Sequence, residues 1–165
     1  MHLNLSEIIN IPGKSVEFDF EMVISDLQFD GVERFDGPCH VVGSVQNHAG
    51  ILELLADVSC NMDCICDRCL TEFHKALELK INAVLSADEA NIDNPEFYYV
   101  DNGSIDLDEI VRTELVLNMD QRFLCREDCK GICPKCGANL NDGPCDCKKE
   151  IDPRLAVLGK LLGNE

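Results

Sequence analysis

The sequence predicts an α+β fold: an antiparallel β body with one or two short helices, followed by a carboxyl-terminal cysteine-rich module. Three observations lead to this prediction. Apolar and polar residues alternate along the first half of the chain, helical spacing follows only later, and ten of the eleven cysteines fall into two clusters. We therefore expect an acidic β-rich body at 1–121, a cysteine-rich module at 122–150 and a helix at 151–165.

Four β-strands are expected, because apolar residues recur at every second position in four stretches. The first stretch is 16–24. The second and third, 39–45 and 51–64, flank residues 46–50, whose Asn and Gly are typical of a hairpin loop. The fourth stretch is 77–85. These stretches predict an antiparallel arrangement.

One face of the strand at 51–64 is expected to point into the core. This face carries Leu52, Leu54, Ala56, Val58, Cys60, Met62 and Cys64. Cys60 is therefore interpreted as a small core residue at strand spacing and not as a metal ligand. Cys39, which stands alone in the sequence, is interpreted as a buried small hydrophobe.

Helical segments are expected after the strands. Residues 86–103 are acidic and rich in turn residues, so a surface connection is expected there. Asp106 followed by Glu109 resembles a capping box, and helical spacing continues from 107 to about 118. Asp152 and Pro153 suit the start of the last helix. Its apolar stripe is expected to dock onto the body or to bind a partner: Leu155, Leu158, Leu161 and Leu162.

The charge of the chain is unevenly distributed. Residues 1–121 carry 24 Asp and Glu against 6 Lys and Arg, a net charge of −18, whereas residues 122–165 carry 7 against 8, a net charge of +1. Proteins attract naked nucleic acid mainly by neutralising phosphates with Lys and Arg. The body is therefore expected to be a poor RNA-binding surface that suits a basic protein partner, or simply a soluble acidic surface.

The cysteines are expected to bind metal. The start of the chain lacks both the basic region and the long apolar core of a signal peptide, and no stretch approaches the ~20 apolar residues that span a bilayer. We therefore expect a cytoplasmic protein without membrane association. In a reducing compartment, paired thiols more often hold metal than form disulfides.

The spacing of the cysteines predicts two four-thiolate sites. Two converging pairs predict the first: Cys133, Cys136, Cys145 and Cys147. The second would join the pair at the end of a strand to the two cysteines left over from the later cluster, and so connect body and module: Cys66, Cys69, Cys125 and Cys129. The alternative is a local site that leaves Cys125 and Cys129 without partners: Cys60, Cys64, Cys66 and Cys69.

Zinc is the expected ion, because these spacings fit structural all-thiolate sites of the zinc-ribbon kind. An iron–sulfur cluster and a redox-active dithiol are the alternatives. Gly137, directly after one cysteine pair, can take the positive φ that follows such a turn. The four histidines are scattered and no catalytic motif accompanies them, so an enzyme is not expected.

Four segments together form a specific pattern: Cys66-Asp67-Arg68-Cys69-Leu70 after a strand, Ile105-Asp106-Leu107 before a helix, the run LCREDCKGICPKCGANLNDGPCDC from Leu124, and Asp152-Pro153-Arg154-Leu155-Ala156-Val157-Leu158. From about residue 40 to the end, this pattern resembles the cysteine-rich version of the YceD family, the large ribosomal RNA subunit accumulation proteins. The resemblance implies a cytoplasmic factor needed for normal levels of 23S ribosomal RNA, and hence a role in large-subunit biogenesis.

The leading hypothesis is a non-enzymatic factor that supports 23S ribosomal RNA accumulation through contacts with a large-subunit ribosomal protein or a pre-ribosomal particle. A second hypothesis is direct binding of ribosomal RNA by the near-neutral carboxyl-terminal region, with these residues as contacts: Arg122, Arg126, Lys130, Lys135, Lys148 and Lys149. The third is a metal-dependent ribonuclease.

Overall fold

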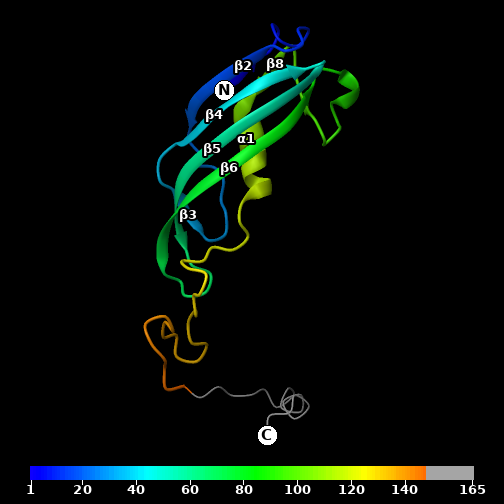
Figure 1. Cartoon of the computed structure of the whole chain (residues 1–165). Coiled ribbons are helices and arrows are strands. Elements are labelled where there is room, and N and C mark those ends of the chain that lie inside the picture. The colour runs from blue at the N-terminus through cyan, green and yellow to red at the C-terminus, as the bar shows by residue number, and fades with distance from the viewer. Residues whose placement is uncertain (148–165) are drawn as a thin grey trace, which may run out of the picture.

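Residues 1–147, which the computed structural model describes, form a twisted sheet with one α-helix against it (Figure 1). The main sheet has the strand order β2-β4-β5-β6-β7, and β3 pairs with the part of β5 that extends beyond β4. A separate two-stranded sheet joins β1 to β8. The elements are β1 (His2–Asn4), β2 (Ser15–Met22), β3 (Val32–Phe35), β4 (Cys39–His48), β5 (Ile51–Ile65), β6 (Glu72–Ser86), η1 (Glu89–Asn91), β7 (Tyr98–Tyr99), β8 (Ser104–Asp106) and α1 (Leu107–Asn118).

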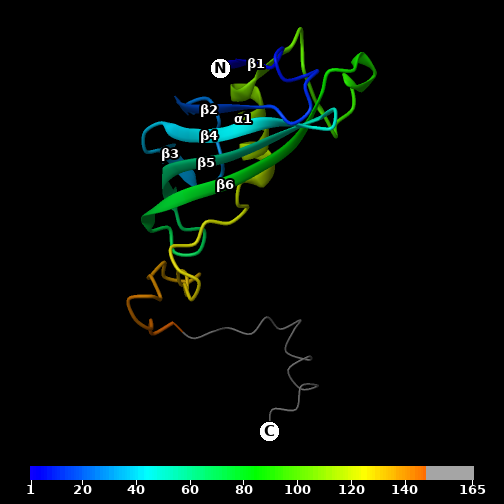
Figure 2. The same cartoon turned by 45° about the horizontal axis from the view of Figure 1, so that its top comes forward.

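Helix α1 covers one face of the sheet, and the core lies between the two (Figures 1 and 2). The buried residues of α1 are Leu107, Ile110, Val111 and Leu115. In β5 every second residue from Leu52 to Cys64 is buried, because successive side chains of a strand point to opposite faces. Burial of each large aliphatic side chain contributes about 1.5–3 kcal/mol. The remaining residues of β5 lie on the solvent side.

The expected strands and the helix at 107–118 are confirmed as β2, β4, β5, β6 and α1. Asp106 caps α1, since its side chain accepts a hydrogen bond from the backbone N–H of Asp108. Strand β6 begins before the first residue of its apolar alternation, because its pairing with β5 starts at Glu72, opposite Ile65, and continues to Leu85.

The expected hairpin between β4 and β5 is confirmed, but its loop is shorter than residues 46–50. The β4–β5 hairpin turns through Ala49 and Gly50 alone, and both residues have positive φ, 54° and 99°, as a two-residue turn between twisted strands requires. Residues 86–103 are more than a surface connection: they contain η1 and β7, and β7 adds a parallel strand beside the end of β6. Val100 in this segment is buried.

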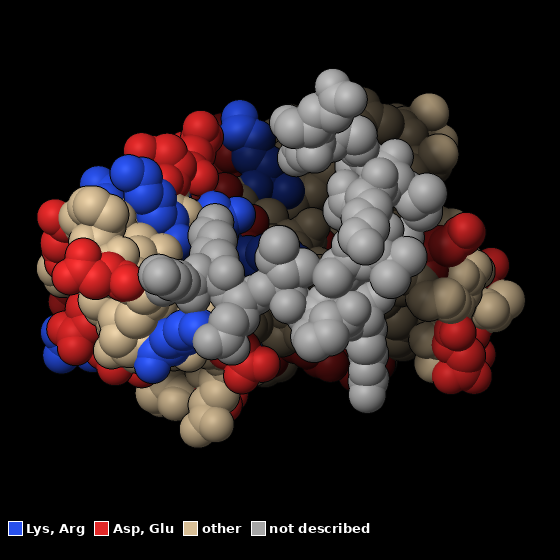
Figure 3. All heavy atoms as spheres, turned by 90° about the horizontal axis from the view of Figure 1, so that it is seen from below, with Lys and Arg blue, Asp and Glu red and all other residues tan. Residues whose placement is uncertain are grey.

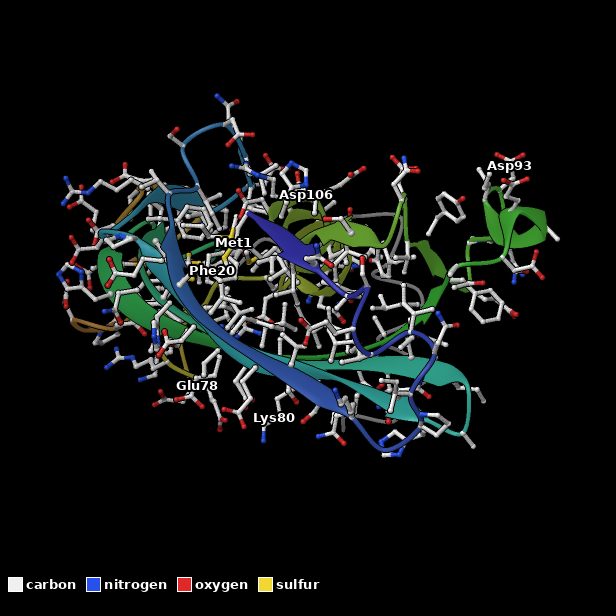
Figure 4. All side chains as sticks on the ribbon, turned by 90° about the horizontal axis from the view of Figure 1, so that it is seen from above. Met1, Phe20, Glu78, Lys80, Asp93 and Asp106 are labelled. Carbon is white, nitrogen blue, oxygen red and sulfur yellow. The ribbon has the colours of Figure 1, made fainter. Side chains whose placement is uncertain are left out.

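The helix expected at 151–165 lies outside the described residues, as do residues 148–150. None of the helices within 1–147 has the length and apolar content needed to cross a membrane. The chain start lies over the beginning of α1, where Figure 4 shows Met1 beside Asp106. The amino group of Met1 lies 3.1 Å from Oδ1 of Asp106 and 2.7 Å from Oδ2 of Asp108.

Asn47 is buried in β4 although its side chain is polar. Its Nδ2 donates to the carbonyl oxygens of Ile8 (2.7 Å) and Ile9 (2.8 Å), and its Oδ1 accepts from the N–H of Gly50 (2.8 Å). One amide therefore ties the segment after β1 to the β4–β5 hairpin, which leaves each of these buried groups paired.

Replacing Asn47 by Ala is expected to lower the free energy of unfolding by about 2–3 kcal/mol, because buried carbonyl groups then lose their donor. Urea denaturation followed by circular dichroism measures the change. His48→Ala is the control. The His48 side chain is exposed, so its removal should change stability by less than about 0.5 kcal/mol. Equal stability of Asn47→Ala and the wild type would contradict this role.

Candidate metal centres

Two segments that are far apart in the sequence meet at the end of the β5–β6 hairpin. The connection between these strands carries Cys66 and Cys69, and the chain after α1 brings Cys125 and Cys129 to the same place. The Sγ atoms of Cys66 and Cys129 lie 3.7 Å apart, those of Cys69 and Cys125 lie 3.6 Å apart, and all four lie within 4.8 Å of one another. A tetrahedral ion with bonds of about 2.3 Å needs sulfurs about 3.8 Å apart. We call these four thiols the junction set.

A second group of four thiols lies within the cysteine-rich module, and we call it the module set. It consists of Cys133, Cys136, Cys145 and Cys147, whose Sγ atoms also lie within 4.8 Å of one another. This set is less enclosed than the junction set: only Cys133 is buried, whereas three thiols of the junction set are buried. Within residues 122–147 the only β pairing is an isolated bridge between Ile132 and Asn139, so a zinc ribbon stays a prediction.

The same turn presents the first two cysteines of each set. The N–H of Leu70 donates to the carbonyl of Cys66, and the N–H of Gly137 donates to the carbonyl of Cys133, both at 2.9 Å. Leu70 and Gly137 have positive φ, 59° and 72°, which confirms the expectation for Gly137. A non-glycine residue in this conformation costs about 1–2 kcal/mol. The positive φ of Leu70 is therefore imposed by the turn and is not the conformation that leucine prefers.

The thiols of the junction set differ in pKa because their hydrogen bonds and their contacts with one another differ. Burial opposes ionisation of Cys66, but backbone N–H groups of Cys125, Cys69 and Arg68 donate to its sulfur and lower its pKa to about 6. Burial, together with contacts with the Cys69, Cys66 and Cys129 thiols, raises the pKa of Cys125 to about 12. Like charges at this spacing repel, so the four groups do not ionise together on their own. A divalent cation is the component that would let all four become thiolates.

The module set shows the same separation. Backbone N–H groups of Cys136 and Lys135 lower the pKa of Cys133 to about 6. Contact with Cys136, together with burial, raises the pKa of Cys147 to about 12. In each set, a positive charge at the centre would favour ionisation of all four thiols.

Other residues around the junction set hold the hairpin connection and the segment after α1 together. The cysteine spacing alone does not indicate these residues. Oδ2 of Asp67 accepts from the N–H of Phe123 (2.7 Å), whose carbonyl accepts from the N–H of Asp67 (2.8 Å). The Arg68 guanidinium donates to the carbonyl of Cys129 (2.9 Å), and Nδ2 of Asn141 lies 3.4 Å from the Cys129 sulfur. Such second contacts orient ligands in metal sites.

Gly131 closes the junction. A Cβ at this position would lie 2.9 Å from the carbonyl oxygen of Arg68, and its φ is 76°. Only glycine allows so close an approach with this backbone conformation. The sequence shows a glycine between two cysteines, but nothing near it indicates that Arg68, in the connection between β5 and β6, lies against it.

The remaining cysteines lie in the body. Cys39 and Cys60 are buried in the main core, as expected, and hydrogen bonding to Cys60 together with burial raises the pKa of Cys39. Cys64 packs with Met62 and Phe123. The local alternative of Cys60, Cys64, Cys66 and Cys69 is therefore not formed.

The four histidines do not form a site. Each lies beside a carboxylate on the surface, and none joins the thiol groups: His2, His40, His48 and His74. Among residues 1–147, the groups of side chains that could hold a metal ion are the junction set and the module set.

Comparisons with known proteins place these features in a family. The family model described as large ribosomal RNA subunit accumulation protein YceD matches residues 54–162, about two thirds of the chain, and this region includes both thiol sets. An uncharacterized protein of Mycobacterium tuberculosis is 31% identical over 104 residues, which cover 61% of this chain and 50% of that protein. The uncharacterized protein YlbN of Bacillus subtilis is 25% identical over 166 residues, which cover 98% of this chain and 96% of that protein.

A chloroplast protein of Arabidopsis thaliana carries a functional name, large ribosomal RNA subunit accumulation protein YCED homolog 1. It is 41% identical over 58 residues, which cover 34% of this chain and 18% of that protein. This chain spans about half the length of the mycobacterial relatives it matches. No solved structure matches the chain.

Replacing Cys66 by Ser is expected to release one metal ion per chain and to separate the module from the body, because the junction set joins these segments. Replacing Cys136 by Ser should release one ion and loosen only the module, with the β body still folded. Metal content and hydrogen exchange of residues 66–71 and 123–130 measure both effects. Cys64→Ser is the control and should keep both ions. Unchanged hydrogen exchange of residues 123–130 in Cys66→Ser would contradict the proposal that the junction set attaches the module to the body.

Proposed function

We propose that this chain, which belongs to the YceD family, supports 23S ribosomal RNA accumulation and large-subunit biogenesis by binding a basic ribosomal protein. The family description supplies the process, and the name of the chloroplast relative states the same process for that protein. The observation that carries the binding mechanism is charge. Residues 1–121 carry a net charge of −18, which favours association with a basic protein and opposes association with free RNA.

Part of this charge lies on the open face of the sheet, away from α1. Residues of β2, β4, β5 and β6 that point outward include a single lysine, Lys80. Figure 4 shows Glu78 and Lys80 pointing away from the body. Six exposed carboxylates lie on the same face: Glu17, Asp19, Glu21, Asp57, Glu72 and Glu78. Such a surface steers a basic partner toward the body.

Direct RNA binding at the cysteine-rich end is a second candidate, and one observation favours it. Lys and Arg side chains lie among Asp and Glu at the end of the molecule seen in Figure 3. However, residues 122–147 carry four basic and four acidic side chains. Four thiolates around a divalent ion add a net charge of −2 for each set. A metal-loaded module is therefore negative, which makes free RNA the weaker candidate.

We infer that both thiol sets hold zinc in a structural role. All eight donors are cysteines, and four thiolates close the coordination shell of zinc, whereas a catalytic zinc keeps one position open. Bound zinc would supply the positive charge that lets four crowded thiols ionise. In the junction set this would hold the module against the hairpin end, so the metal would position a surface and not perform a reaction.

Protein purified without chelator is expected to contain about two zinc ions per chain. Elemental analysis measures the metal, with the Cys66→Ser and Cys136→Ser variants each expected to retain about one. Iron in stoichiometric amount, with the visible absorption of an iron–sulfur cluster, would contradict the zinc assignment.

The proposed function predicts two results. In cells depleted of the protein, the ratio of 23S to 16S ribosomal RNA should fall and should recover when the wild-type protein is supplied. Purified basic large-subunit proteins should bind the chain with an affinity that falls as salt rises. An acidic ribosomal protein of similar size is the control. Submicromolar, sequence-selective binding of protein-free 23S fragments would instead support the RNA-binding candidate.

A further inference from the structure

Strand β6 has one free edge along most of its length. It pairs with β5 from Glu72 to Leu85, but on the other side β7 pairs only with Leu85 and Ser86. Figures 1 and 2 show β6 as the outermost long strand on this side of the sheet. Within the described part of the chain, no strand pairs with the outer edge of β6 between Glu72 and Val84. A row of unpaired backbone N–H and C=O groups is a template for another strand.

A groove of about 570 Å³ lies at one end of this edge. Its walls come from residues 82–84 of β6, the connection at 92–97, Tyr98 of β7, and α1. Leu117 of α1 is 71% exposed and Ile92 is 53% exposed, and both line the groove. The Tyr98 hydroxyl donates to Oε1 of Glu114 (2.8 Å) and ties β7 to the helix. Large apolar side chains that stay exposed around a hollow mark a binding surface.

The charge around the groove has one sign. The lining residues include Asp93, Glu96 and Glu114 and no Lys or Arg. Figure 4 shows Asp93 at the outside of the connection between β6 and β7. The lysines of β6 lie elsewhere along the strand and have carboxylate partners: Lys75 with Asp120 (2.5 Å) and Lys80 with Asp57 (3.9 Å). An apolar groove with an acidic border fits a segment that carries both apolar and basic side chains.

We propose that the free edge of β6 and this groove bind an extended basic segment of a protein partner by strand addition. The inference rests on the proposed function for the identity of the partner as a basic protein. Backbone hydrogen bonds to β6 would supply affinity, and alternate side chains of the added strand would point toward α1. One apolar side chain then enters the groove beside Leu117 and Ile92. The Lys or Arg side chains next to it in the sequence point to the open face of the sheet, where Glu72 and Glu78 of β6 are exposed.

A peptide probe tests the surface without requiring the ribosomal partner. The probe is a ten-residue peptide in which Val or Ile alternates with Lys or Arg, and the control is the same peptide with Glu in place of the basic residues. Titration into ¹⁵N-labelled, metal-loaded full chain should shift the resonances of residues 77–84, 92–97 and 113–117. Backbone amides of β6 should become protected from hydrogen exchange at alternate positions. The acidic control should not bind.

Two neighbouring substitutions in α1 provide the matched comparison. Leu117→Lys places a cation in the groove and should weaken peptide binding at least about tenfold, as expected for loss of an apolar anchor. Val116→Lys makes the same change at a residue that is 54% exposed but does not line the groove, and binding should stay within about twofold. Because both side chains are exposed, both variants should melt at the wild-type temperature.

The possible results separate this inference from the proposed function. Equal peptide binding by Leu117→Lys and Val116→Lys, or unprotected β6 amides in the complex, would overturn strand addition at this edge. Binding of a basic ribosomal protein that leaves β6 unprotected would also overturn it, while the proposed function stands. Peptide binding at β6 without binding of any large-subunit protein would support the surface and count against the function. A wild-type dimer that Leu117→Lys converts to a monomer would assign the edge to a second copy of this chain and overturn the proposal.

Discussion

The crowding of four thiols at the end of the β5–β6 hairpin sets the position of the chain that follows α1. Cys66 and Cys69 belong to the hairpin, Cys125 and Cys129 to the later segment, and their sulfurs lie within 4.8 Å of one another. Ionised thiols at this distance repel, so a cation at the centre of the four sulfurs would stabilise the arrangement. Because a preformed site is absent from an unfolded chain, a metal bound by these four thiols would couple its binding to the attachment of the module.

The hydrogen bonds around the junction set show how the backbone prepares this event. The paired bonds between Asp67 and Phe123, and the bond from Arg68 to the carbonyl of Cys129, align the two segments beside the thiols. Phe123 is buried with Met62 and Cys64 in a small apolar cluster of its own. Apolar burial therefore brings the segments together, while backbone N–H groups of Cys125, Cys69 and Arg68 lower the pKa of Cys66 and favour its thiolate. The apolar cluster and the four thiols therefore join the same two segments of the chain.

The long elements could be predicted from the sequence because their pattern is local. Alternation in β2, β4, β5 and β6, and the cap and spacing of α1, depend only on neighbouring residues. Strands β1, β3, β7 and β8 have two to four residues each, and they form strands only because a distant segment supplies hydrogen bonds. The sequence predicts Asn47 in a loop for a related reason. Its buried position depends on hydrogen bonds to Ile8 and Ile9, which nothing near it in the sequence indicates.

For the cysteines too, the grouping could be predicted from the sequence, whereas the backbone conformation and the close contacts around them could not. Spacing predicted the local pairs, and elimination of Cys60 as a core residue pointed to the cross-chain grouping that the structure brings together. The positive φ of Leu70 and the need for Gly131 could not be predicted. A leucine on its own disfavours the positive φ found at Leu70. The clash that excludes a side chain at Gly131 involves Arg68, more than sixty residues away.

The β5–β6 hairpin connects the thiol end of the molecule to the groove end. Each of its strands has 15 residues, so at about 3.3 Å per residue the hairpin spans roughly 45 Å. The junction set lies at its turn, and β7 and the groove lie at its open end. A strand added along β6 and a metal bound at the turn would both oppose opening of the same hairpin. Their free energies are therefore linked through any state in which the hairpin frays, and each would bind more tightly in the presence of the other.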